Sequence, residues 1–158
     1  MRRLLIIVAL IFAHTAWSGN FEDGVAAYQR KDYATAFAKY RSAAQQGSTS
    51  AHLNIGIMYM LGQGVAQDYK EAVRWWLLAE KQGYAQSQYN LGVMYAKGQG
   101  VLQDYVRAHM WSNIAAIDGD KDSVKNRDLA ASKMTPQQVE QAQRMARECM
   151  ASNFKKCD

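Results

Sequence analysis

The segment "GQGVAQDY" at residues 62–69 returns as "GQGVLQDY" at residues 98–105, and this pair decides the fold. Paired glycines before a helix fit two structures. They form either a turn that points backbone amides at a phosphate or a joint between helices. The surroundings favour the joint, because residues 54–83 and 90–119 carry the same amino acid at fifteen of thirty positions. Self-similarity at a period of 36 residues is typical of stacked helix-turn-helix units.

Two repeated features predict where the helices of each unit begin and end. Asp68 and Asp104 are expected to cap the second helix, because an aspartate side chain accepts hydrogen bonds from the free amides of the first turn. The glycine pairs at 62–64 and 98–100 are expected to end the first helix, where a residue with positive φ closes the last turn.

Glycine also recurs inside the first helix of each unit, at Gly56 and Gly92. It costs about 1 kcal/mol there relative to alanine. The loss indicates that a paired helix passes too close for a side chain, and Ala72 and Ala108 are the matching small residues of that helix.

The aromatic residues follow the same period. The repeated positions, expected to fill the space between units, are Tyr59, Tyr95, Trp75 and Trp111. Trp76 has Tyr40 36 residues earlier and Ser112 36 residues later, so core packing is the expectation for it too, and an anchor for a partner on the outer face is the alternative.

These patterns predict an all-α chain of helix-turn-helix repeats closed by a capping helix. A divergent first repeat is expected at residues 20–47, repeats 2 and 3 at 48–83 and 84–119, and a terminal half-repeat at 120–134. The capping helix and tail occupy residues 135–158. There Thr135 is the expected N-cap, Pro136 the first helical residue and Gln138 the partner in a capping box.

Residues 1–18 are predicted to be an export signal. Arg2 and Arg3 precede an apolar stretch, and Ala16-Trp17-Ser18 is a small-x-small cleavage site. A retained membrane anchor is the alternative, but the apolar stretch falls well short of the ~20 residues that span a bilayer. We therefore expect an exported protein, periplasmic or secreted, with no stable membrane span.

Charge and cysteine content bear on the partners and the compartment. Loss of Arg2 and Arg3 lowers the formal charge from +5 to +3, and no long basic run argues for nucleic-acid binding. Cys149 and Cys157, the two cysteines, are predicted to form a disulfide in an oxidising compartment. Closing this short loop stabilises by about 2–3 kcal/mol. The alternative is two unpaired thiols.

At this point a family resemblance is evident. The segments "LNIGIMYMLGQGVAQDYKEAVRWWLLAEKQGYAQ" and "YNLGVMYAKGQGVLQDYVRAHMWSNIAAIDGD" resemble Sel-one-like repeats, relatives of the tetratricopeptide repeat. The resemblance implies a right-handed α-solenoid whose first helices line a concave groove. It also implies an adaptor or scaffold that binds a protein or peptide segment in that groove.

The groove residues that this resemblance implies lie at spacings that share one helical face. They are Asn54, Ile57, Tyr89, Asn90, Val93, Lys97, Lys125 and Asn126, with Gln86, Asp122, Leu129 and Lys133 on the same faces. The three asparagines recur every 36 residues, and amides can bond an extended backbone. The lysines favour an acidic or C-terminal peptide segment. The alternative is a solvated surface, and association between copies of the chain is also open.

No catalytic residue, cofactor or metal site is predicted. A dinucleotide fingerprint requires a third glycine after a strand, and Gln67 and Gln103 occupy that position. The rival reading is an enzyme acting on cell-wall peptides or β-lactams, as assigned to some secreted members of the family that this chain resembles. Ser152-Asn-Phe-Lys155 matches Ser-x-x-Lys, but the Ser-Asp-Asn and Lys-Thr-Gly motifs that accompany it are missing.

Overall fold

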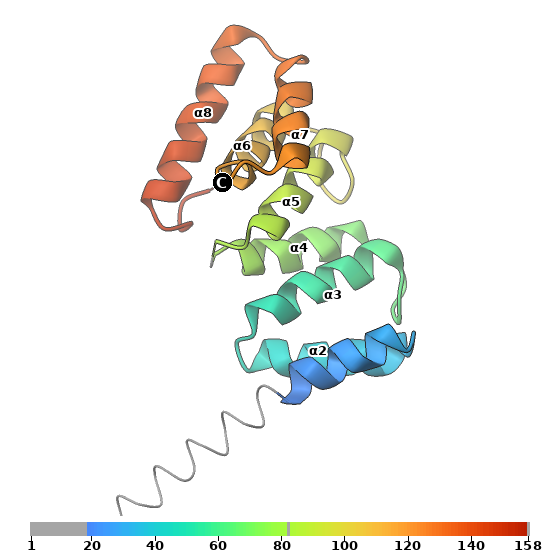
Figure 1. The fold of residues 1–158 in the computed structure, drawn as a ribbon. Coiled ribbons are helices and arrows are strands. Elements are labelled where there is room, and N and C mark those ends of the chain that lie inside the picture. The colour runs from blue at the N-terminus through green and yellow to red at the C-terminus, as the bar shows by residue number, and fades with distance from the viewer. Residues whose placement is uncertain (1–18, 82, 158) are drawn as a thin grey trace, which may run out of the picture. The chain divides into compact units, whose positions relative to one another are not determined.

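The computed structural model describes residues 19–81 and 83–157, and every regular element in these ranges is a helix (Figure 1). The predicted export signal lies outside the described residues. The chain forms two compact units that divide between Gln67 and Asp68. None of the described helices has the length and apolar character required to cross a bilayer.

The first unit contains a helix over residues 19–29, then α2 (Tyr33–Gln45) and α3 (Thr49–Leu61). Tyr40 of α2 is the largest side chain of its core, and it stacks on Phe21 with ring centroids 5.6 Å apart. A Cβ at Gly24 would lie only 2.7 Å from the Tyr40 ring. The glycine therefore lets the first helix approach α2.

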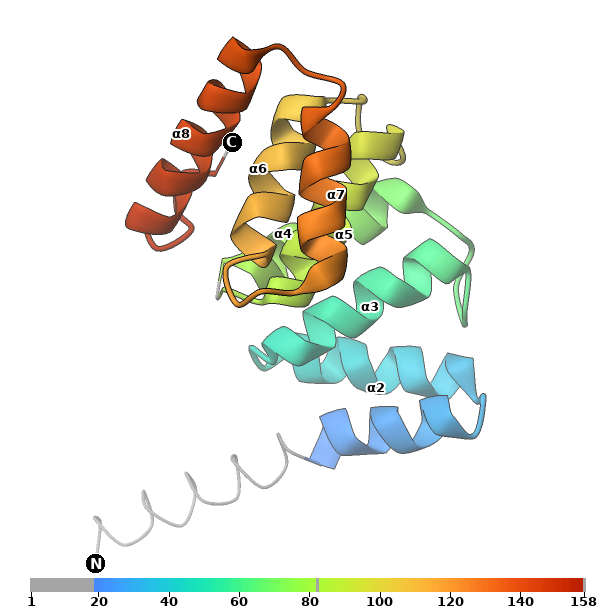
Figure 2. The same ribbon diagram turned by 45° about the horizontal axis from the view of Figure 1, so that its top comes forward.

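The second unit contains α4 (Tyr69–Glu80), α5 (Ala85–Lys97), α6 (Tyr105–Ala115), α7 (Lys121–Ala131) and α8 (Pro136–Ala151). Helix α5 packs against α4, α6 and α7. Figure 2 shows α6 with α8 on one side and α7 on the other, in agreement with the contacts of α6. Helix α7 packs against α5 as well as against α6.

The predicted caps are confirmed. The Asp68 carboxylate accepts hydrogen bonds from the backbone amides of Lys70 and Glu71, at 2.9 and 3.1 Å. Asp104 caps α6 in the same way through the amide of Arg107, at 3.0 Å. At the start of α8, Thr135 and Gln138 form the expected capping box with Pro136 in the first turn.

The two glycine pairs are joints, as the repeat predicts. Gly62 and Gly98 end α3 and α5 with φ of 67°. The second glycine of each pair does something that the pattern did not predict. A Cβ on Gly64 would collide with the carbonyl oxygen of Tyr33, and a Cβ on Gly100 with that of Tyr69. Each turn thus packs against the backbone at the start of the second helix of the preceding repeat.

The repeated glutamine of each turn completes the joint. The Gln67 side-chain amide donates to the carbonyl of Met60 at 2.8 Å, and Gln103 donates to the carbonyl of Ala96 at 2.9 Å. Because these carbonyls lie in the last turn of the preceding helix, the glutamine ties the turn back to that helix. A phosphate-binding role gives no reason for a glutamine at the same position of both turns, whereas a joint between helices does.

Gly92 fulfils the prediction of close helix packing. A Cβ at this position would lie 2.5 Å from the Ser112 hydroxyl and 3.3 Å from the carbonyl oxygen of Ala108, both on α6. Gly56 is buried in α3. Its predicted approach to Ala72 crosses from one unit to the other and stays a prediction.

The repeated tryptophan positions and their neighbour Trp76 are buried to different degrees. Trp76 is fully buried, as core packing predicts, which excludes the outer-face alternative, whereas Trp75 is only half-buried. Trp111 is buried as expected. The absence of a repeated aromatic at the Trp76 position did not signal exposure, because the inward face of α4 includes that position together with Ala72, Val73 and Ala79.

We predict that Gly100→Ala lowers the free energy of unfolding by about 2–5 kcal/mol, since left-handed strain and a backbone collision add together. Gly119→Ala is the matched control, because Gly119 has a similar φ of 81° but open space around its Cβ position. It should cost only the strain, about 1–2 kcal/mol. Urea denaturation of both variants measures the difference, and equal losses would contradict the joint.

Candidate functional site

A cavity of about 200 Å³ opens between the C-terminal ends of α5 and α7. It is lined by Val93, Ala96, Lys97, Tyr105, Asn126, Leu129, Ala130 and Lys133. Most of this lining is aliphatic or aromatic, and Leu129 is 59% exposed. The cavity is therefore an apolar pocket that is open to solvent, which we call the basic-end pocket after its two lysines.

Three hydrogen-bond donors belong to the basic-end pocket, two of them exposed and one buried. The side chains of Lys97 and Lys133 are exposed, and neither forms an ion pair in the described part of the chain. The amide nitrogen of Asn126 is buried and has no hydrogen-bond partner among the described residues. All three are donors, so the pocket suits an apolar group that carries a negatively charged or carbonyl oxygen.

A second cavity of about 170 Å³ lies at the N-terminal ends of α5 and α7. It is lined by Ala85, Gln86, Tyr89, Ala115, Asp120, Asp122 and Ser123, and we call it the acidic-end pocket. Asp120 caps α7 through the backbone amide and hydroxyl of Ser123, at 2.8 and 2.6 Å. These hydrogen bonds lower the pKa of Asp120, the one from the Ser123 side chain most strongly. Asp120 therefore stays ionised at neutral pH.

The structure brings together some of the predicted groove residues. Val93, Lys97 and Asn126 line the basic-end pocket, and Tyr89 lines the acidic-end pocket. Lys125 is exposed on α7 and lines neither pocket.

The other three predicted residues have different surroundings. Asn90 is 9% exposed, and its side-chain oxygen accepts a 3.4 Å hydrogen bond from Gln86. Asn54 and Ile57 belong to α3 in the first unit, where both are half-buried. Asn54 is a side-chain hydrogen-bond partner of Tyr40. The three asparagines thus share a sequence position but not an environment.

Sequence reasoning missed several lining residues, chiefly Tyr105, Ala96 and Asp120. Tyr105 belongs to the repeated Asp-Tyr element, which suggested a purely structural role. Its ring lines the basic-end pocket, and its hydroxyl accepts a 3.2 Å hydrogen bond from Gln103. Asp120 is a residue type that caps helices, but nothing in its spacing indicated that it lines a pocket together with Tyr89.

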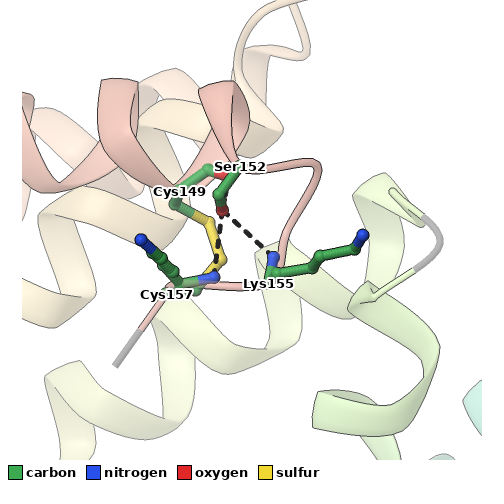
Figure 3. The surroundings of a disulfide bond; sticks show 5 residues. Cys149, Ser152, Lys155 and Cys157 are labelled. Atoms are coloured by element: carbon green, nitrogen blue, oxygen red, sulfur yellow. Dashed lines mark hydrogen bonds between the residues drawn. A yellow bond between two sulfur atoms is a disulfide. The ribbon is translucent and has the colours of Figure 1, made fainter.

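The Ser-x-x-Lys match has a structural explanation (Figure 3). The Ser152 hydroxyl donates to the carbonyl of Cys149 at 2.7 Å and accepts from the backbone amides of Lys155 and Lys156, at 3.1 and 3.0 Å. It therefore caps the end of α8. The side chain of Lys155 points away from this hydroxyl, so it is not placed to activate Ser152 as a nucleophile.

The sulfur atoms of Cys149 and Cys157 lie 1.99 Å apart, at bonding distance. The chain between them folds back through two left-handed residues, Asn153 and Phe154. The Phe154 ring reaches Gly83, so the tail covers the turn between α4 and α5. The Glu80 carboxylate is buried beside the sulfurs, with ligand atoms of all three residues within 4.8 Å of one another. Sulfurs bonded to each other do not act as thiolate metal ligands.

Comparison with known proteins agrees with the repeat pattern. The Sel1 repeat model matches residues 19–48, 49–84 and 85–120. No curated protein sequence matches the chain significantly. Among solved structures, one similar chain is c5321, a protective antigen present in uropathogenic Escherichia coli that displays an SLR fold. It has 27% identity and a TM-score of 0.80, over 87% of this chain and 31% of that one.

A second similar structure is a Sel1 repeat protein from Oxalobacter formigenes. Its identity is 28% and its TM-score 0.66, over 82% of this chain and 53% of that chain. The chain therefore spans about a third and about half of the lengths of these two relatives.

Proposed function

The chain belongs to the Sel1 repeat family, whose members are generally non-catalytic scaffolds for protein interactions, and we propose that it binds a partner's peptide segment between α5 and α7. The basic-end pocket carries the proposal. It combines an apolar lining with three donors and no acidic side chain. Such a pocket fits one apolar side chain next to a carboxylate, as at the C-terminus of a partner.

The size of the pocket supports an anchor of this kind. A cavity of about 150 Å³ lined by aliphatic side chains holds a benzene molecule, and the basic-end pocket is larger at about 200 Å³. A leucine or phenylalanine side chain buried there gains about 1.5–3 kcal/mol from the hydrophobic effect. That anchor alone is weak, so the lysines and the Asn126 amide must contribute through charge-assisted hydrogen bonds.

We predict that Lys133→Gln weakens binding of leucine-terminated peptides about 5- to 10-fold, because the carboxylate loses one cation. Lys125→Gln is the matched control: the residue is a lysine on the same helix that lines neither pocket. Titration calorimetry with free and C-terminally amidated peptides measures both effects. Amidation should weaken binding to the unaltered protein by a similar factor. No binding by any peptide, or equal loss in both variants, would overturn the proposal.

We also propose that the protein is exported, that residues 1–18 are removed and that Cys149 and Cys157 form a disulfide. The support for export is that residues 1–18 combine a basic start, an apolar stretch and a small-x-small site. The support for the disulfide is that the Cα atoms of the two cysteines lie 4.6 Å apart, within the range that such a bond requires. The bond would hold Phe154 over Gly83 and fix the tail on the second unit.

The corresponding prediction concerns the intact mass of the protein after expression of the full chain in a bacterium. Protein from the periplasm or medium should begin at Gly19 and lack two hydrogen atoms relative to a reduced sample. Alkylation before and after reduction should label zero and two cysteines. A product that retains residues 1–18 would refute their removal. A product that is alkylated without reduction would refute the disulfide.

A further inference from the structure

Two pockets of opposite charge lie at opposite ends of α5 and α7, and we call the surface that runs between them the groove. The two helices lie side by side, and their N-terminal ends border one pocket while their C-terminal ends border the other. Asp120 and Asp122 are the charged residues of the acidic-end pocket, whereas Lys97 and Lys133 are those of the basic-end pocket. No side chain of opposite charge lines either pocket.

The charges exceed what the helices need for their own stability. Acidic residues at helix N-termini and basic residues at C-termini offset the macrodipole, which amounts to roughly half an elementary charge per helix end. Two helices therefore present about one charge at each end of the groove. The side chains that line each pocket supply two, so the lining of one pocket keeps a net negative charge and the lining of the other a net positive charge.

The acidic-end pocket has a further feature that suits a cation. Tyr89 lines it together with the two aspartates and is half-buried. An aromatic ring attracts a lysine or arginine head group that lies near its face. This attraction does not depend on the aspartates, so two separate interactions favour the same kind of side chain.

The spacing between the pockets fixes the spacing of a ligand. Tyr89 and Lys97 lie eight residues apart on α5, and Asp122 and Lys133 eleven residues apart along α7 and the turn after it. At 1.5 Å per helical residue the first separation is about 12 Å, and the helical part of the second, from Asp122 to Ala131, is about 14 Å. An extended peptide covers them in about four to five residues, at roughly 3.3 Å each.

On the basis of the proposed function, we propose that the groove selects a partner's C-terminal segment with lysine or arginine four residues before an apolar last residue. The last side chain occupies the basic-end pocket with its carboxylate between the two lysines. The earlier cation lies between Asp122 and Tyr89. The segment therefore runs in the same direction as α5.

The test compares two N-acetylated peptides of identical composition and charge. One ends in Lys-Ser-Gly-Ser-Leu and the other in Ser-Gly-Ser-Lys-Leu, so that only the position of the cation differs. Titration calorimetry at low ionic strength should show the first binding about 5- to 10-fold more tightly. The preference should shrink at high salt, because the interaction is between exposed charges.

Asp122→Asn should reduce the preference between the two peptides to about 2-fold or less, because Asp120 and Tyr89 still line the pocket. Asp118→Asn is the matched control, because Asp118 is an exposed aspartate in the turn before α7 that lines neither pocket. Circular dichroism shows whether each variant keeps its helices. Equal binding of both peptides to the unaltered protein would overturn the polarised groove while leaving the proposed function intact. Failure of both peptides and of all other leucine-terminated peptides would end both.

Discussion

The close approach of a glycine to the backbone of the preceding repeat is the constraint on which the rest of the structure depends. Gly64 lies against the carbonyl of Tyr33, and 36 residues later Gly100 lies against the carbonyl of Tyr69. Both glycines have φ of 73°, a conformation that other residues adopt only with strain. Because the contact involves backbone atoms, no change of rotamer relieves a clash there. The glycines thus fix where each turn packs against the preceding repeat.

The two pockets between α5 and α7 follow from this packing. The turn that contains Gly100 leads into α6. Gly92 lets α5 approach α6 closely enough to touch Ser112. With α6 behind them, α5 and α7 lie side by side, and their exposed faces meet at two pockets. The chemistry of the groove then depends on side chains outside the repeated positions, chiefly Lys97 and Lys133. A repeated framework with unrepeated groove residues suits a scaffold whose specificity is set locally.

The sequence period was sufficient to predict the helices, their caps and the joints, because each depends on local rules that repeat with the chain. The site was less predictable, because its residues depend on neighbours from other helices. Asn54, Asn90 and Asn126 occupy one repeated position, yet the first bonds Tyr40, the second bonds Gln86 and the third lines a pocket. Their partners differ between repeats, so no spacing rule distinguishes them. The same reason explains why Gln86, Tyr89 and Asp122 were predicted as groove residues but their grouping with Asp120 in an acidic pocket was not.

Amide hydrogen exchange in the Gly100→Ala protein tests the central claim most directly, since it reports the stability of each helix separately. If the turn is seated on the start of α4, an added Cβ should lower protection throughout α4, α5 and α6, with the amides near Tyr69 among the most affected. If protection falls only within residues 98–104, the glycine stabilises its own turn alone, and the account of how the repeats are joined is wrong.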